Sequence, residues 1–460
     1  MKTILAFDDF VLNRSDNTKR VFKQPEWRFD CIYTDEEYNP RGIWPSMVVQ
    51  APDGGFMMIY SGVPGTVDAI DDEHMCRFIA YSKDGLHFEP YTVNPNAQYP
   101  HMNGRICNEL GSVPYLDKEE TNSEYRYKSP CAPYGYNGDT LVKEPICIIG
   151  SPDLIHWKRI NDGKATPSFV DCTPSLLHNP VTGNWQMTTR RRWGERRICL
   201  VESPDLKNWT MPRGIIHPLP DDEPLTHFYG MPHYYYEPGD IFIGLLWEQV
   251  MPFNSIMEGP LFTEYAYSYD GLMWNRTKAV MTPTNLPRGE FGAGMFTVQS
   301  MIDCGDEIRF YATAFRSEHG GIPGGWQPGM PGNSAMIPGV LKKNRFVCID
   351  SGKGKAELIT QWLRLNKPEL RINANIPFGS LKAELRANGQ AIEGFGLNDF
   401  HNIVGDHLDA ELHWRGDLNK LVESGRWFQL HIVFEQAEIY AITGDFDFNI
   451  NTRAPVYERL

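Results

Sequence analysis

The amino-acid sequence predicts an all-β chain, a five-bladed β-propeller followed by a C-terminal β-sandwich. Three observations favour this fold class. A short phrase that ends in an aromatic residue recurs four times, and each copy follows an apolar run of strand length. After Gly354 the phrase disappears, and alternating polar and apolar residues take over. Helical periodicity is nearly absent, so we expect sheets to bury the apolar residues.

The recurring phrase reads Ser-x-Asp, two turn-forming residues, one spacer and an aromatic residue. Its copies occupy residues 82–88, 151–157, 203–209 and 268–274. An aspartate in this position can accept hydrogen bonds from backbone N–H groups two residues on and hold a tight turn. We therefore expect the four aspartates to be structural, each closing one small sheet: Asp84, Asp153, Asp205 and Asp270.

The sequence around these phrases divides into five units of three or four predicted strands. The first unit has strand-like runs at 43–49 and 55–60, joined by the hairpin signal Pro52-Asp-Gly-Gly. Later units open near residues 107, 171, 228 and 294. Small sheets that repeat in this way indicate a propeller, which protects its strand edges by closing into a ring.

The predicted domain boundaries follow from this change of pattern. Residues 1–40 form a lead-in that packs on the domains, 41–350 form the propeller, and 351–460 form the sandwich. Within 351–460, period-two alternation predicts strands at 370–376, 381–386, 408–414 and 427–434. A long Gly- and Pro-rich loop at 317–340 carries Trp326, Met330 and Met336, which favours a lid or an interface contact over disorder.

Composition excludes several classes of function. The formal net charge of −14 disfavours binding to nucleic acid or to an anionic membrane surface. Nine cysteines without a Cys-x-x-Cys pair indicate free thiols, and the apolar runs are too short for a signal peptide or a membrane span. We therefore expect a cytoplasmic protein. His, Cys and carboxylate residues lack zinc-binding spacing, so we expect neither a metal nor another cofactor.

The predicted site is an axial funnel. The first strand of each blade lines the axis, so side chains at the same end of these strands converge in one concave site. The predicted funnel residues are Arg41, Glu109, Asp171, His227, Tyr229, Arg288 and Glu290. Glu248 follows Trp247 at the end of another strand of the fourth unit. Carboxylates that share one pocket repel each other, so at least one should have a raised pKa, as an acid/base pair requires.

With its repeated turns and trailing sandwich, the sequence resembles glycoside hydrolase family 32 and the related families 43, 68 and 130. Residues 169–174 resemble the Arg-Asp-Pro phrase of blade three, which implies that Asp171 is the transition-state stabiliser. Two phrases depart from the family pattern: residues 39–42 lack the blade-one nucleophile, and 229–232 lack the blade-four acid/base Glu. The phrases Phe7-Asp-Asp-Phe10, Tyr229-Gly-Met-Pro232 and Gln436-Ala-Glu-Ile-Tyr440 give a closer resemblance to uncharacterised propeller-plus-sandwich proteins related to family 32.

This resemblance implies a glycoside hydrolase that acts on a short oligosaccharide, such as a β-fructofuranoside or an arabinofuranoside. Asp171 would hold substrate hydroxyls or stabilise positive charge, while Glu290, Glu109 and Glu248 are the candidates for acid and base. Aromatic faces for the sugar would come from Trp44, Tyr229 and Trp247. A carboxyl separation of about 5 Å would give retention, and one of about 6.5–9.5 Å would give inversion.

Two alternatives remain open at this point. The run of arginines at 190–197 has either alternating solvated faces or a phosphate clamp, as in the phosphorylases of family 130. Because two catalytic positions depart from the family pattern, a non-catalytic carbohydrate-binding propeller is the other alternative. The expected partner is a carbohydrate, and a homo-oligomer is compatible with the sequence.

Overall fold

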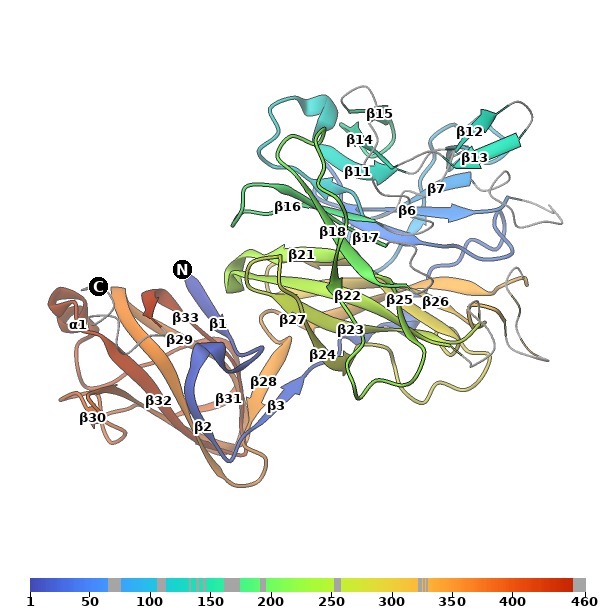
Figure 1. The fold of residues 1–460 in the computed structure, drawn as a ribbon. Helices are drawn as coiled ribbons and strands as arrows, with labels where there is room; N and C mark the ends of the chain where they lie inside the picture. Colours follow the sequence, from blue (N-terminus) through green and yellow to red (C-terminus); the bar gives the residue numbers. More distant parts are fainter. Residues whose placement is uncertain are drawn as a thin grey trace.

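The structure is a computed structural model of the chain. It describes residues 1–64, 76–105, 113–131, 134–137, 140–143, 146–160, 174–190, 196–251, 258–321, 325, 327 and 330–449. This part of the chain is nearly all β (Figure 1), and its one α-helix is α1 (Leu418–Ser424). Asp417 caps α1 by accepting a hydrogen bond from the Asn419 N–H, and Gly425 ends it at φ 59°.

Three antiparallel meanders follow one another along the chain. The first contains β5 (Ser46–Gln50), β6 (Phe56–Gly62), β7 (Cys76–Ser82) and β8 (Glu89–Pro90), with β9 (Met102–Arg105) also paired to β7. The second contains β10 (Tyr115–Leu116), β11 (Tyr127–Cys131), β14 (Cys147–Ser151) and β15 (Lys158–Arg159), and β12 (Tyr134–Asn137) pairs with β13 (Thr140–Lys143) as a separate hairpin. The third contains β16 (Ser175–His178), β17 (Trp185–Arg190), β18 (Ile198–Ser203) and β19 (Arg213–Ile216).

Two further meanders share one sheet. The fourth contains β20 (Thr226–Gly230), β21 (His233–Tyr236), β22 (Ile241–Val250), β23 (Leu261–Ser268) and β24 (Asn275–Val280). The fifth contains β25 (Met295–Asp303), β26 (Glu307–Phe315) and β27 (Ser334–Lys342). Its outermost strand is β4 (Glu26–Trp27), paired to β27 through Val340 and Glu26. The last meander is therefore completed by a strand from the start of the chain.

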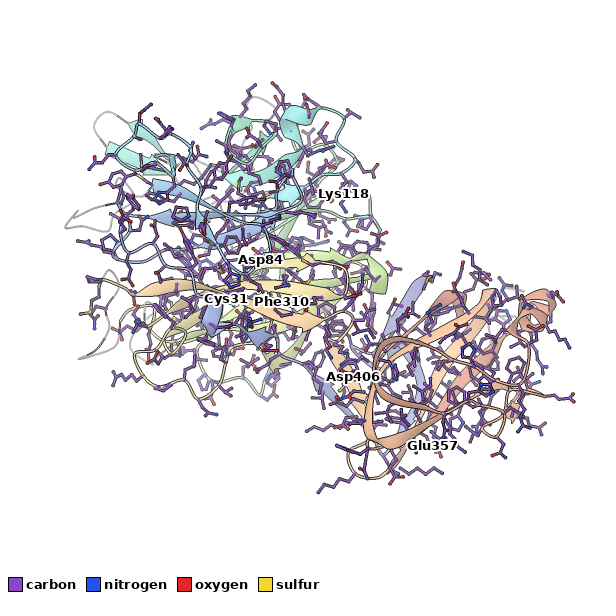
Figure 2. All side chains as sticks on the ribbon, turned by 180° about the vertical axis from the view of Figure 1, so that it is seen from behind. Cys31, Asp84, Lys118, Phe310, Glu357 and Asp406 are labelled. Atoms are coloured by element: carbon purple, nitrogen blue, oxygen red, sulfur yellow. The ribbon has the colours of Figure 1, made fainter. Side chains whose placement is uncertain are left out.

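The remaining strands form one large sheet with a core of its own. It contains β28 (Val347–Asp350), β29 (Lys355–Ala387), β30 (Gln390–Ala391), β31 (Ile403–Glu411), β32 (Phe428–Glu435) and β33 (Glu438–Asn449). Three strands of the predicted lead-in join it, β1 (Lys2–Leu5), β2 (Leu12–Asp16) and β3 (Lys19–Phe22), seen in blue among orange and red strands in Figure 1. Asp406 of this sheet lies where it meets the meanders (Figure 2) and forms ion pairs with Lys342 and Arg345.

The repeated Ser-x-Asp phrase forms the same turn in all four places, between β7 and β8, β14 and β15, β18 and β19, and β23 and β24. In the fourth copy, Asp270 Oδ1 accepts the N–H groups of Leu272 at 2.7 Å and Met273 at 2.8 Å, and the Ser268 hydroxyl at 3.0 Å. The Trp274 indole N–H donates back to the Gly271 carbonyl oxygen at 3.1 Å. The predicted turn role of these aspartates is confirmed.

The turn needs a left-handed residue directly after the aspartate. Two copies place glycine there, Gly85 and Gly271, each at φ 73°. The other two hold a leucine in this conformation, Leu154 at φ 69° and Leu206 at φ 61°. Both leucine side chains are buried. Their apolar burial offsets a backbone conformation that costs a non-glycine residue about 1 kcal/mol.

Asp270→Ala should lower the free energy of unfolding by about 1–2 kcal/mol, because two backbone N–H groups lose a charged acceptor. The wild-type carboxyl also has a lowered pKa, owing to these hydrogen bonds against the opposing effect of burial. A carboxylate with a lowered folded-state pKa stabilises the fold at neutral pH, and this contribution is lost as the pH falls below about 4. Urea unfolding at pH 7 and pH 3 should therefore show a smaller deficit at pH 3. Met273→Ala, at an exposed position of the same turn, is the matched control.

Candidate active site

The candidate site lies at the end of the meanders where their first strands begin. Tyr229 occupies a β-bulge in β20: Phe228 pairs with Glu248 and Gly230 pairs with Trp247, so Tyr229 has no partner across the ladder. Bulges re-aim side chains and are frequent beside active sites.

Three side chains from other meanders surround the Tyr229 ring. The Tyr229 hydroxyl lies 3.0 Å from His319 Nε2. The guanidinium groups of Arg190 and Arg196 lie 4.7 Å and 5.2 Å from the ring centre. Arg190 also donates to the Tyr229 carbonyl oxygen at 3.4 Å. Two cationic side chains therefore lie over one aromatic ring.

His227 holds the segment that carries Arg196. The backbone N–H of Arg196 donates to His227 Nδ1 at 3.1 Å, so Nδ1 carries no proton and the ring proton of the neutral imidazole is on Nε2. The Arg196 side chain donates to Gln249 Oε1 at 3.3 Å. His227 therefore positions an arginine of the site. Its side chain is buried, so it does not present an open face to a ligand.

Two carboxyl groups lie beside the Tyr229–His319 pair. Glu318 follows the end of β26, and the His319 N–H donates to the Gly259 carbonyl oxygen at 3.1 Å, which brings Glu258 to the same place. A Cβ added at Gly320 would lie 2.3 Å from Glu258 Cγ, so only glycine lets the two segments lie this close together. Burial raises the pKa of Glu318, Arg288 opposes the rise and Glu258 adds to it. A half-buried carboxyl with a raised pKa, beside a second carboxyl, is a suitable general acid.

Several predicted funnel residues lie at this end. Arg288 acts electrostatically on Glu318, and Glu290 is exposed on the same loop before β25. Arg316 holds that loop by donating to the Gly289 carbonyl oxygen at 2.8 Å. Arg41 and Trp44 are half-buried just before β5.

The loop after β26 connects Glu318 with the segment before β5 that carries Arg41. The Ser317 N–H donates to Asn333 Oδ1 at 3.0 Å, and the Gly332 N–H donates to the Pro40 carbonyl oxygen at 2.7 Å. The loop that carries Glu318 therefore also contacts the segment that carries Arg41. In the predicted 317–340 segment, Met336 is instead a buried residue of β27, and Met330 is exposed. Trp326 lies outside the described residues.

The structure gives Trp247 and Glu248 packing roles instead of the predicted site roles. Trp247 is fully buried, and its indole N–H donates to the Val298 carbonyl oxygen at 2.8 Å, so neither ring face can stack on a sugar. Glu248 belongs to a buried ion cluster described next. Asp171 and Glu109 lie outside the described residues.

The ion cluster has one arginine among three carboxylates. Arg276 lies 2.5 Å from Glu264 Oε1 and 2.8 Å from Glu248 Oε2, and it also pairs with Asp222. Its guanidinium stacks 4.6 Å from the Phe228 ring centre. Burial, together with Glu264, raises the pKa of Glu248 to about 7, and burial likewise raises that of Glu264. The cluster ties the segment before β20 to the fourth meander.

Asp35, one of the acids before β5, is also structural. Its carboxylate accepts hydrogen bonds from the Tyr60 hydroxyl at 2.8 Å and from Asn39, and it lies 3.1 Å from His101 Nε2. All four side chains are buried. Asp35 therefore joins the segment after β4 to the first meander and has no open face for substrate.

Neither a membrane helix nor a metal cluster is found in the part of the chain that the structure describes. No helix there combines the length and apolar character needed to cross a bilayer. No group of three or more His, Cys, Asp or Glu side chains there has an arrangement that could hold a metal ion.

Comparison with known proteins gives matches among solved structures only. No protein-family model matches the chain, and no curated protein matches it. An N-acetylgalactosamine deacetylase from F. plautii, in complex with blood group B trisaccharide, is similar with a TM-score of 0.45 and 13% identity, over 72% of this chain and 97% of that chain. A β-1,2-mannobiose phosphorylase from Listeria innocua has a TM-score of 0.42 and 13% identity, over 68% and 96% of the two chains. An α-L-arabinanase from Penicillium chrysogenum has a TM-score of 0.39 and 14% identity, over 70% and 98%.

Such likenesses, at TM-scores below 0.5, assign neither a family nor an activity to this chain. The resemblance to family 32 stays a prediction.

Proposed function

We propose that the chain is a carbohydrate-active enzyme, a glycoside hydrolase that cleaves a short oligosaccharide beside Tyr229, His319 and Glu318. In this proposal the five meanders are the blades of a five-bladed β-propeller, and the large sheet at 347–449 with β1 to β3 is a β-sandwich. The observation that carries the function is that Glu318, a half-buried carboxyl whose pKa is raised by burial, lies near a second carboxyl, Glu258, beside the Tyr229–His319 pair.

In the proposed reaction, each proton transfer is assigned to a side chain. In this step Glu318 donates a proton to the glycosidic oxygen as the bond to the sugar breaks. A second carboxylate takes a proton from the water molecule that attacks the sugar carbon, and Glu258 is the described candidate for this role. The Tyr229 hydroxyl and His319, hydrogen-bonded to each other, would bind sugar hydroxyls and fix the ring against the acid. A β-fructofuranoside or an arabinofuranoside is the proposed substrate.

Phosphorolysis is the second candidate, and the two arginines on Tyr229 favour it. Arg190 and Arg196 come from opposite sides of one loop between β17 and β18 and meet at a single aromatic ring. A phosphate bound beside these guanidinium groups would replace water as the nucleophile, and one catalytic acid would then suffice.

A substrate screen separates these candidates. We expect sucrose, 1-kestose or arabinobiose to release reducing sugar from the purified protein in buffer without phosphate. Turnover that requires phosphate and yields a sugar phosphate would replace hydrolysis by phosphorolysis. Calorimetric binding of these sugars with no cleavage in either buffer would contradict both, and would identify a non-catalytic carbohydrate-binding protein.

A further inference from the structure

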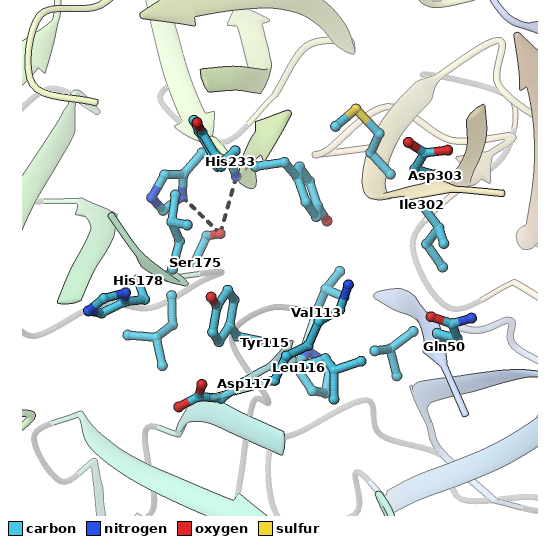
Figure 3. A pocket seen from close by; sticks show the side chains of 18 of the residues that line it. Gln50, Val113, Tyr115, Leu116, Asp117, Ser175, His178, His233, Ile302 and Asp303 are labelled. Atoms are coloured by element: carbon cyan, nitrogen blue, oxygen red, sulfur yellow. Dashed lines mark hydrogen bonds between the residues drawn. The ribbon is translucent and has the colours of Figure 1, made fainter. Parts of the chain in front are cut away.

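A cavity lies at the opposite end of the same first strands. Its volume is about 510 Å³, and it is lined by the ends of β5, β16, β21 and β25 and by the segment around β10. Figure 3 shows side chains from these strands facing one another around it. Its lining includes none of the residues that form the candidate active site, and Tyr235 lies six positions after Tyr229 along the chain. It is therefore a separate place on the molecule.

Fixed aromatic rings form part of its wall. The Tyr234 hydroxyl donates to the Gln299 carbonyl oxygen at 2.6 Å, and the Tyr235 hydroxyl donates to Asp240 Oδ1 at 2.8 Å. Tyr115 packs edge-on against Trp185, with ring centres 5.5 Å apart. Rings held in this way offer contact area to a ligand at a low cost in conformational entropy.

The charged groups of the cavity select against anions. Four carboxylates line it, with one lysine: Asp117, Glu119, Glu237, Asp303 and Lys118. Two of these carboxylates have cationic partners, Asp117 with Lys128 at 2.7 Å and Asp303 with Lys343 at 3.4 Å. The net charge of these groups and their partners is negative, so phosphate or an acidic sugar would be repelled. Carboxylates are acceptors, and the hydroxyl groups of a neutral sugar are matching donors.

A buried Ser–His pair in the wall supports binding rather than catalysis. Ser175 Oγ accepts the His233 backbone N–H at 3.2 Å and lies 3.1 Å from His233 Nδ1, as the dashed lines in Figure 3 show. Burial lowers the pKa of His233 to about 3, so the imidazole is neutral at physiological pH but too weak a base to activate a serine. The pair therefore adds an uncharged polar patch to an aromatic and acidic cavity.

We propose that this cavity is an accessory binding site for a neutral oligosaccharide, with Tyr115, Tyr234 and Tyr235 as stacking rings and the rim carboxylates as hydroxyl acceptors. The ligand class rests on the proposed function, because a carbohydrate-active enzyme meets oligosaccharides as its substrates. The site needs no chemistry of its own. It would hold one part of a longer chain, or a second molecule, while cleavage proceeds at the other end of the strands.

The test measures binding and turnover separately, with 1-kestose and arabinobiose as probes. We expect titration calorimetry of the Glu318→Gln variant to show two sites, and Tyr115→Ala in the same background to weaken one of them at least tenfold. Glu237→Gln, at an exposed rim position, should weaken the same site about threefold. Glu393→Gln, an exposed carboxylate of the large sheet, should change neither site and is the matched control. Thermal melting checks that each variant folds.

The outcomes distinguish this proposal from the proposed function. Tyr115→Ala in the wild-type background should leave kcat within twofold on any disaccharide that is cleaved. The accessory site is wrong, whatever the turnover, if Tyr115→Ala and Glu237→Gln both bind sugar as the Glu318→Gln protein does. It is also wrong if spermidine binds in the cavity and the sugars do not. If no sugar is cleaved but Tyr115→Ala still loses one site, the accessory site stands and the hydrolase proposal fails.

Discussion

Glu318→Gln is expected to lower kcat by about 10²- to 10⁴-fold, with a much smaller change in KM. Glutamine keeps the size and shape of the glutamate side chain and can still form hydrogen bonds, but it has no acidic proton to donate to the leaving oxygen. A substrate whose leaving group is already a weak base, such as a p-nitrophenyl glycoside, needs no such proton. Its kcat should therefore fall far less, and the ratio of the two effects identifies the general acid.

The pH dependence gives a second signature of the same residue. Because burial raises the pKa of Glu318, its protonated form persists above the usual range for a carboxyl, and activity should decline as the pH rises through that value. This alkaline limb should disappear in Glu318→Gln. Glu290→Gln is the matched comparison, since it makes the same change on the neighbouring exposed loop. A loss of rate there, with full activity in Glu318→Gln, would assign the acid to Glu290 instead.

Arg276→Met is expected to lower the free energy of unfolding by about 3–5 kcal/mol at pH 7.5. The methionine keeps the contact with Phe228 but leaves Glu248, Glu264 and Asp222 buried without their common cation. Guanidinium chloride unfolding measures the loss. Arg213→Met is the control, since its 3.0 Å ion pair with Glu202 is half exposed and should contribute less than about 1 kcal/mol.

The sign of the pH effect separates this loss from a simple packing defect. The pKa of Glu248 is raised in the folded protein, so the folded state binds a proton that the unfolded state has released between about pH 4.5 and 7. Wild-type stability should accordingly fall as the pH rises through this window, and Glu248→Gln should flatten the curve. In Arg276→Met the fall should be steeper, because more buried carboxyls must then lose protons. A deficit that is the same at pH 5 and pH 7.5 would contradict the ion-cluster account.

The nearly all-β fold could be predicted from the sequence because its signals are local. The Ser-x-Asp turn is determined by hydrogen bonds within four residues, as at Asp270, so each copy can be recognised without knowledge of the rest of the chain. The role of residues 2–22 could not be predicted in this way. Lys2 pairs with Gly444, and Asp16 pairs with Glu357, and no local pattern encodes partners so distant.

The candidate site was only partly predictable. Tyr229 and Arg288 could be predicted because they stand near the starts of first strands, and the arginine run because it is the densest positive charge in an acidic chain. Glu318 and His319 were missed since they lie in an irregular loop, where no periodicity shows which side chains turn inward. The signal that could have found them is the run Arg316-Ser-Glu-His directly after a strand. Trp247 and Glu248 were wrongly expected in the site. Both side chains are buried, and the sequence of one strand does not show which neighbouring strands will bury its side chains.

The pairing of β4 with β27 sets an order on folding. The first thirty or so residues leave the ribosome before everything they contact, since β1 to β4 find their partners only in strands that begin at Ser334 and beyond. Until those strands exist, this early segment has no neighbour to shield its backbone. Contacts so far apart in sequence form slowly. Strands β1 to β4 can thus be fixed in place only after the strands from Ser334 onward have been made.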